Sequence, residues 1–307
     1  MTSPTPSVHL PPGRSGWIIL DKPLGLGSTQ AVGAVKRALR EAGEPRTKVG
    51  HGGTLDPLAT GVLPIALGEA TKLAGRMLDA IKGYEFTVCF GMQTDTLDLE
   101  GKPVATSAHR PTLAEIEALL PRFTGPIEQV PPAYSALMVD GQRAYDRARA
   151  GEEVVLNSRT VTILALDIGH PPEHSAVVDS ITLAATVSKG TYIRSLARDL
   201  ALALGTVGHV TMLRRTRAGP FTLAQAIPLD FLHQCAKGGA LDGAVLPLAK
   251  GLDDIPAFPV TSEEARLLRH GQRLSRIPRN GGLHLAIDGD IPVALVEEDR
   301  IVRGFNL

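Results

Sequence analysis

The stretch from Lys48 to Pro64 constrains the fold most, because its composition excludes a continuous helix. It reads Lys-Val-Gly-His-Gly-Gly-Thr-Leu-Asp-Pro-Leu-Ala-Thr-Gly-Val-Leu-Pro. Proline restricts the residue before it to extended backbone, so Asp56, which precedes Pro57, should lie outside any helix. Its glycines permit close approach of another backbone. A carboxylate held in this way beside His51 suggests a reactive group in a cleft, although an ordinary turn whose aspartate binds neighbouring backbone fits the same spacing.

The length of 307 residues makes two domains the natural expectation. Apolar residues make up 43% of the chain and charged residues 21%, proportions typical of a globular protein. The two cysteines, Cys89 and Cys235, argue against a disulfide framework. No apolar run is long enough to span a membrane, and residues 1–15 lack the apolar core of a signal peptide. We therefore expect a cytoplasmic protein with a disordered tail over residues 1–15.

The net charge is zero, but the charge is unevenly distributed along the chain. Residues 1–82 carry a net charge of +4, residues 83–140 carry −5, residues 141–217 carry +3 and residues 218–307 carry −2. If the two basic segments fold onto one face, they present a phosphate-binding surface. Solvated helix and strand faces explain the same counts.

Hydrophobic periodicity predicts a mixed order of helices and strands rather than a regular alternation. The expected helices are 28–41, 69–80, 112–123, 144–150, 191–204 and 262–270. The expected strands are 16–20, 84–90, 133–139, 160–168, 181–188, 207–216, 283–287 and 292–297. This order favours an α+β fold with a mixed, largely antiparallel central sheet flanked by helices. The chain becomes rich in loops after residue 219, and we expect a boundary that separates domains 16–250 and 251–307.

Hydroxyl side chains mark three of the expected helix starts. Ser28 or Thr29 is suited to cap the first helix, and Thr191 the helix over residues 191–204. Thr112 with Glu115 has the spacing of a capping box.

The sequence contains no nucleotide-binding fingerprint and no metal-ligand spacing. Besides the Asp56 stretch, three further segments could carry chemistry. They are Lys-Gly-Tyr-Glu-Phe at 82–86, Ser-Lys-Gly-Thr-Tyr-Ile-Arg at 188–194 and His-Val-Thr-Met-Leu-Arg-Arg-Thr at 209–216. Taken singly, the tyrosines of these segments fit half-buried core aromatics and Arg194 fits a surface cation.

Taken together, these segments resemble the TruB-type tRNA pseudouridine synthases, bacterial enzymes that isomerise uridine 55 in the tRNA T-loop. The resemblance covers most of residues 16–220 and includes Gly91–Asp98, Gln129–Leu137 and Gly141–Tyr145. It implies the pseudouridine synthase fold with a small C-terminal PUA-like β-domain, although residues after 250 resemble that domain only loosely. Gly27 departs from the pattern, because many relatives have Thr or Ser there.

The resemblance also implies residue roles. Asp56 would be the catalytic nucleophile, with the choice between attack on C1′ and removal of the C2′ proton left open. Tyr84 would stack on the target base, and Tyr192 would contact its other face. Two further residues would contact the RNA: His51 near the vacated base position and Leu213 beside the flipped nucleotide. Four would support the site: Arg194 paired with Asp56, Lys22 and Pro23 supporting the active-site loop, and Asp98 near the site.

The resemblance implies a monomer that acts on the tRNA T-stem-loop and needs no cofactor, no metal, no guide RNA and no membrane. Three alternatives stay open. The chain could be an RNA-binding or RNA-folding module in which Asp56 is structural, or a guide-RNA-dependent relative of the same fold. It could also be a metal-dependent hydrolase that uses His51 and Asp56.

Overall fold

The computed structural model describes residues 13–139, 141–170, 177–274, 281–298 and 300–307. Its internal contacts divide the chain into two compact units, each assembled from segments that are distant in sequence. The first unit comprises residues 1–55, 62–78 and 219–307, and the second comprises residues 56–61 and 79–218.

The second unit is built on a largely antiparallel sheet. Its strand order is β12 (Gly208–Ala218), β4 (Lys82–Phe90), β11 (Ser180–Val187), β10 (Arg159–His170) and β7 (Gly125–Gln129). These neighbours pair antiparallel, whereas the first residues of β3 (Ala59–Leu67) pair parallel with β12 and place Leu213 opposite Ala59. The predicted α+β class with a mixed, largely antiparallel sheet is confirmed.

Helix α5 (Ile193–Ala203) packs on this sheet, and α3 (Leu113–Leu119) contributes to the same core cluster. The cluster includes Phe86 of β4 and Leu196 of α5, both fully buried. Full burial of such side chains contributes roughly 1.5–3 kcal/mol each. This apolar contact fixes the start of α5 relative to β4 and β12.

The capping box predicted for the start of α3 is confirmed. The Glu115 amide donates to the Thr112 hydroxyl at 3.2 Å, and the Thr112 amide donates to the Glu115 carboxylate at 2.7 Å. The helix continues as the 3-10 helix η2 (Leu120–Phe123).

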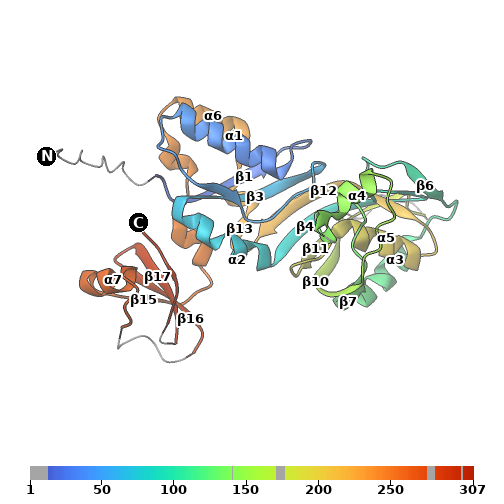
Figure 1. Cartoon of the computed structure of the whole chain (residues 1–307). Coiled ribbons are helices and arrows are strands. Elements are labelled where there is room, and N and C mark those ends of the chain that lie inside the picture. Colours follow the sequence, from blue (N-terminus) through green and yellow to red (C-terminus); the bar gives the residue numbers. More distant parts are fainter. Residues whose placement is uncertain (1–12, 140, 171–176, 275–280, 299) are drawn as a thin grey trace. The chain divides into compact units, whose positions relative to one another are not determined.

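In the first unit, β1 (Gly16–Lys22) lies between β3 and the parallel strand β14 (Ile227–Pro228). Strand β2 (Val49–His51) pairs antiparallel with the end of β3. Helices α1 (Ser28–Glu41) and α6 (Leu229–Lys237) lie side by side (Figure 1).

A four-stranded sheet ends the chain, in the order β15 (Ala257–Pro259), β16 (Leu283–Asp288), β17 (Ile291–Glu297) and β18 (Arg300–Gly304). Helix α7 (Ser262–Arg269) shares one apolar cluster with these strands. The small C-terminal β-domain in the predicted fold class therefore has its own core.

Several sequence predictions are wrong in detail. The strand predicted over 133–139 is reduced to β8 (Met138–Val139), which pairs with β9 (Gln142–Arg143) before α4 (Ala144–Arg149). The helix predicted over 69–80 is the 3-10 helix η1 (Gly68–Leu73) followed by α2 (Ala74–Asp79). The region described as loops after residue 219 contains α6, and Pro228 stands at its N-cap, before the helix.

Two predicted helix caps have other functions. The N-cap of α1 is Gly27, and the Ser28 hydroxyl binds the backbone of Leu55 instead. Helix α5 begins at Ile193, and the Thr191 hydroxyl donates to the Ser188 carbonyl at 3.0 Å. Both hydroxyls therefore tie loops to the fold.

Of the tail predicted over residues 1–15, residues 1–12 lie outside the described residues, and residues 13–15 are described. Ser15 accepts a hydrogen bond from the Glu69 amide at 3.0 Å, and Arg14 pairs with Glu44 at 2.6 Å. None of the helices in the described ranges is long and apolar enough to cross a membrane.

We predict that Gly61→Ala destabilises the protein. Gly61 has φ +97°, and an added Cβ would overlap the carbonyl oxygen of Arg215 on β12. Strain of this kind costs of order 1–3 kcal/mol, which urea denaturation followed by circular dichroism would resolve. The matched control is Gly75→Ala, where a Cβ meets no atom within 4 Å. Equal stability of the Gly61→Ala variant and the wild type would contradict the prediction.

Candidate active site

Asp56 lies on irregular backbone immediately before β3, outside any helix as predicted. The preceding residue is fixed, because the Leu55 amide donates to the Ser28 hydroxyl at 2.8 Å and that hydroxyl donates to the Leu55 carbonyl at 3.0 Å. The Asp56 carbonyl accepts a hydrogen bond from the Ala59 amide at 3.0 Å. The Asp56 side chain is 37% exposed, so this well-anchored carboxylate remains accessible.

The Arg194 guanidinium lies between two carboxylates. Its Nη2 is 2.9 Å from Oδ2 of Asp56, and its Nη1 is 3.5 Å from Oδ2 of Asp98. The same nitrogens donate to the carbonyls of Thr96 at 2.8 Å and Tyr134 at 3.0 Å. With a side chain only 6% exposed, Arg194 is a fixed cation that sets the direction of the Asp56 carboxylate.

The backbone is strained at Leu97, the residue before Asp98. Leu97 is buried and has φ +64°, a conformation that is unfavourable for a residue with a Cβ. The residues on either side of Leu97 both make hydrogen bonds. The Thr96 carbonyl accepts one from Arg194, and the Asp98 carboxylate accepts one from the Glu100 amide at 3.0 Å. Strained backbone of this kind is characteristic of functional sites.

Gln129 positions the start of α5 and was not anticipated as a site residue. It is fully buried, and its side-chain amide donates to the Tyr192 carbonyl at 3.2 Å and accepts from the Tyr192 amide at 2.8 Å. This pair of hydrogen bonds holds the turn that carries Arg194. The quoted Gln-Val-Pro-Pro motif contains Gln129, but only the fold shows what its side chain binds.

Asp56, Asp98, Arg194 and Leu213 line one hollow of about 20 Å³, together with Leu58, Ala59, Val210, Thr211 and Met212. We call it the Asp56 hollow. Four residues predicted from separate segments are thus brought together. A volume of this size holds about one water molecule and is too small for a pyrimidine ring.

Tyr84 and Tyr192 belong to the same unit without lining the Asp56 hollow. Tyr84 is half-buried on β4 opposite Arg215, and it packs on the core cluster that Leu213 also contacts. The Tyr192 ring lies 5.0 Å from the Arg159 guanidinium, a cation–π contact at the N-cap of α5.

Three other predicted residues belong to the first unit. His51 is half-buried at the end of β2, opposite Ile65. Lys22 is fully buried, and its ammonium donates to the carbonyls of Pro23 at 3.1 Å and Leu26 at 2.7 Å. Lys22 and Pro23 therefore fix the turn between β1 and α1.

The chemistry available at the Asp56 hollow is that of one oriented carboxylate. Arg194 already occupies the position between Asp56 and Asp98 that a cation would take. Within the described residues, no group of three His, Cys, Asp or Glu side chains is arranged to hold a metal ion. Asp56 can act on a substrate as a nucleophile or as a base.

Lys82 is buried in this unit, as Arg194 and Arg215 are, and it lies two residues before Tyr84. Burial, followed by the nearby Arg215 cation, lowers the pKa of Lys82 from its ordinary 10.5 to about 8. Its side chain lies in a crowded basic environment at the start of β4.

Comparisons with known proteins agree with this geometry. The family model described as "TruB family pseudouridylate synthase (N terminal domain)" matches residues 36–193, and "tRNA pseudouridylate synthase B C-terminal domain" matches residues 194–253. The chain is 62% identical to "tRNA pseudouridine synthase B" of Novosphingobium aromaticivorans, over 95% of this chain and 97% of that relative. It is 56% identical to the protein of the same name from Zymomonas mobilis, over 99% and 98%.

Solved structures show the same fold. One is "Structure of H/ACA RNP bound to a substrate RNA containing 2'-deoxyuridine", with a TM-score of 0.70 and 25% identity over 95% of this chain and 85% of the other. Another is "Crystal Structure of a Cbf5-Nop10-Gar1 Complex", with a TM-score of 0.69 and 26% identity over 94% and 84%.

The lowered pKa of Lys82 predicts how stability depends on pH. Below pH 8 the lysine is protonated in both states, and its buried charge opposes folding. Between pH about 8 and 10.5 the folded protein loses this proton while the unfolded chain keeps it, so the free energy of unfolding rises with pH. Lys82→Met should remove this contribution, whereas Lys102→Met, at an exposed position, should keep it. Parallel urea titrations at pH 7.5 and pH 10 would measure it, and identical pH dependence in both variants would contradict it.

Proposed function

The chain belongs to the TruB family of pseudouridylate synthases, and from this premise we propose that it converts uridine 55 in the tRNA T-loop to pseudouridine. The observation that carries the proposal is the Asp56–Arg194 pair in the Asp56 hollow. It supplies one accessible, oriented carboxylate, which is the reactive group that this isomerisation needs.

Uridine and pseudouridine are isomers, so the reaction needs no net oxidant or hydrolytic water. The bond between N1 and C1′ breaks, the uracil turns, and a bond between C5 and C1′ forms. The proton on C5 leaves, and N1 ends protonated. Asp56 either adds to C1′ or removes the C2′ proton, and Arg194 holds its carboxylate in place for both routes.

The target base must leave the folded T-loop before Asp56 can reach its sugar. We assign Tyr84 and Leu213 to one wall of the base site, since both pack on the core cluster that contains Ile193 of α5. Stacking on Tyr84 would contribute about 1–3 kcal/mol toward the cost of unstacking. Tyr192 would contact the other face of the base, and His51 would lie near the vacated position in the RNA.

We propose that the Asp56 hollow widens when the base enters, because about 20 Å³ does not admit a pyrimidine. Leu58 and Leu213 line it with flexible apolar side chains, whereas Arg194 is fixed by two backbone carbonyls. We assign any adjustment around the base to this apolar wall. Lys22 and Pro23, at the turn before α1, would support the active-site loop.

We further propose that residues 16–250 form the catalytic domain and residues 251–307 a PUA-like domain. The enzyme would act as a monomer in the cytoplasm, on tRNA alone. Action on tRNA alone is supported by the high identity to bacterial relatives whose names state tRNA. The likeness to the H/ACA structures, at lower identity, is weaker support for a guide-RNA complex.

Asp56→Asn should abolish pseudouridine formation, because the amide is neither a nucleophile nor a base, while tRNA binding largely survives. Tritium release from tRNA labelled at uracil C5 measures turnover, and filter binding measures affinity. The matched control is Asp199→Asn. Asp199 is also paired with an arginine, 2.8 Å from Arg198, but it lies outside the Asp56 hollow, so this variant should keep turnover. Full tritium release by Asp56→Asn would refute the role of Asp56.

The purified chain should also release tritium from an isolated T-stem-loop without any added RNA or protein. The guide-dependent alternative predicts release only when guide RNA and partner proteins are supplied. A pure RNA-binding module predicts binding without release. A metal-dependent hydrolase predicts loss of activity in a chelator, which we do not expect.

A further inference from the structure

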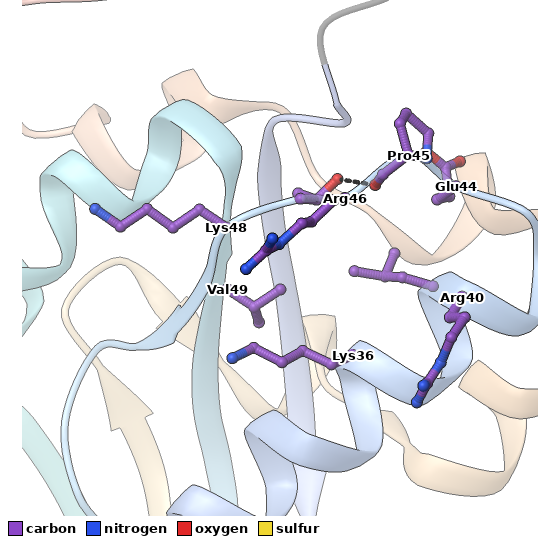
Figure 2. A pocket seen from close by; sticks show the side chains of 9 residues that line it. Lys36, Arg40, Glu44, Pro45, Arg46, Lys48 and Val49 are labelled. Atoms are coloured by element: carbon purple, nitrogen blue, oxygen red, sulfur yellow. Dashed lines mark hydrogen bonds between the residues drawn. The ribbon is translucent and has the colours of Figure 1, made fainter. Parts of the chain in front are cut away.

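A second pocket lies in the first unit, between the last turns of α1, the loop after it and the start of β2. Its volume is about 800 Å³. Four of its lining residues are cationic, and Figure 2 shows their long side chains. We call it the basic pocket; it is lined by Lys36, Leu39, Arg40, Glu44, Pro45, Arg46, Thr47, Lys48 and Val49. It shares no lining residue with the Asp56 hollow.

The charge of the basic pocket is not neutralised by the protein. Lys36, Arg40, Arg46 and Lys48 are all exposed, and no carboxylate in the described part of the chain forms an ion pair with them. Glu44 is the one acidic residue of the lining, and its carboxylate already accepts two hydrogen bonds from Arg14, at 2.9 and 2.6 Å.

Such an arrangement concentrates positive charge that a bound anion would offset. Lys36 and Arg40 are one turn apart on the same face of α1, where like charges repel. Arg46 and Lys48 bring two further cations to the opposite wall. Four unpaired cations around one hollow therefore match a ligand with several negative charges.

The lining also indicates which part of a polyanion it suits. The basic pocket contains no aromatic side chain that could stack on a base. Its polar groups are mainly cations, which bind phosphate oxygens and do not read sequence. Its volume far exceeds that of one phosphate, so it can receive consecutive phosphates of a backbone.

We propose that the basic pocket binds the sugar–phosphate backbone of tRNA, as a contact separate from the one that presents the target uridine. The inference rests on the proposed function, because tRNA is then the polyanion that the enzyme must hold. Its contribution is to affinity and not to chemistry.

The test compares two neighbouring arginines on α1. Arg40 lines the basic pocket, whereas Arg37 is exposed on the same helix outside it. Arg40→Gln should weaken tRNA binding and reduce the slope of log K against log salt by about one, while Arg37→Gln should not. The double variant Arg46→Gln/Lys48→Gln should reduce the slope by about two and raise the KM for tRNA roughly tenfold. The kcat for bound tRNA should stay unchanged in all three.

Binding curves for full tRNA at several salt concentrations, with thermal unfolding as a folding control, supply these values. Affinity and slope of Arg40→Gln equal to those of Arg37→Gln would overturn the proposal. Binding of inorganic phosphate at the basic pocket, with tRNA affinity unchanged by the double variant, would overturn it in favour of a small-anion site. If the wild type forms no pseudouridine, the proposed function fails separately, because the binding assay requires no turnover.

Discussion

The ion pair between Arg194 and Asp56 is the interaction on which the site depends. A buried guanidinium is costly to desolvate, and the fold offsets this cost with two carboxylates and two backbone carbonyls. The Asp98 carboxylate and the turn that carries Arg194 are themselves held in place. Asp98 lies beside a strained Leu97, and the turn that carries Arg194 is tied to Gln129. The apolar core under α5 thus serves to place one cation, and the cation serves to direct one carboxylate.

The two pockets differ in the physical properties that suit them to different tasks. The Asp56 hollow is small, and it combines one fixed cation, Arg194, with an apolar wall, which suits chemistry on one nucleotide. The basic pocket is wide, exposed and cationic, which suits sequence-independent affinity. Zero net charge conceals this arrangement, because acidic residues elsewhere balance the cations without pairing with them.

Local signals in the sequence predicted much of the fold. The capping box at Thr112 and Glu115 and the alternation in 181–188 each depend on neighbouring residues, and both elements are present. Ser28 shows why other predictions were wrong. Its hydroxyl is suitable for a cap, yet it binds Leu55, a residue remote in sequence. Likewise, the residue types at Asp56 and Arg194 were consistent with a turn and a surface cation, and only the family resemblance brought them together. The role of Gln129 requires a tertiary contact that no local pattern encodes.

The small volume of the Asp56 hollow has a consequence for the fate of the detached base. During the proposed reaction the uracil is, for a moment, bonded to neither its old nor its new atom, and it could diffuse away and leave an abasic tRNA. A site that opens only as far as the base requires leaves little space for solvent to follow. Rotation of the detached uracil within the site then competes only with its slow escape into solvent. Confinement of the uracil thus protects the tRNA from losing a base.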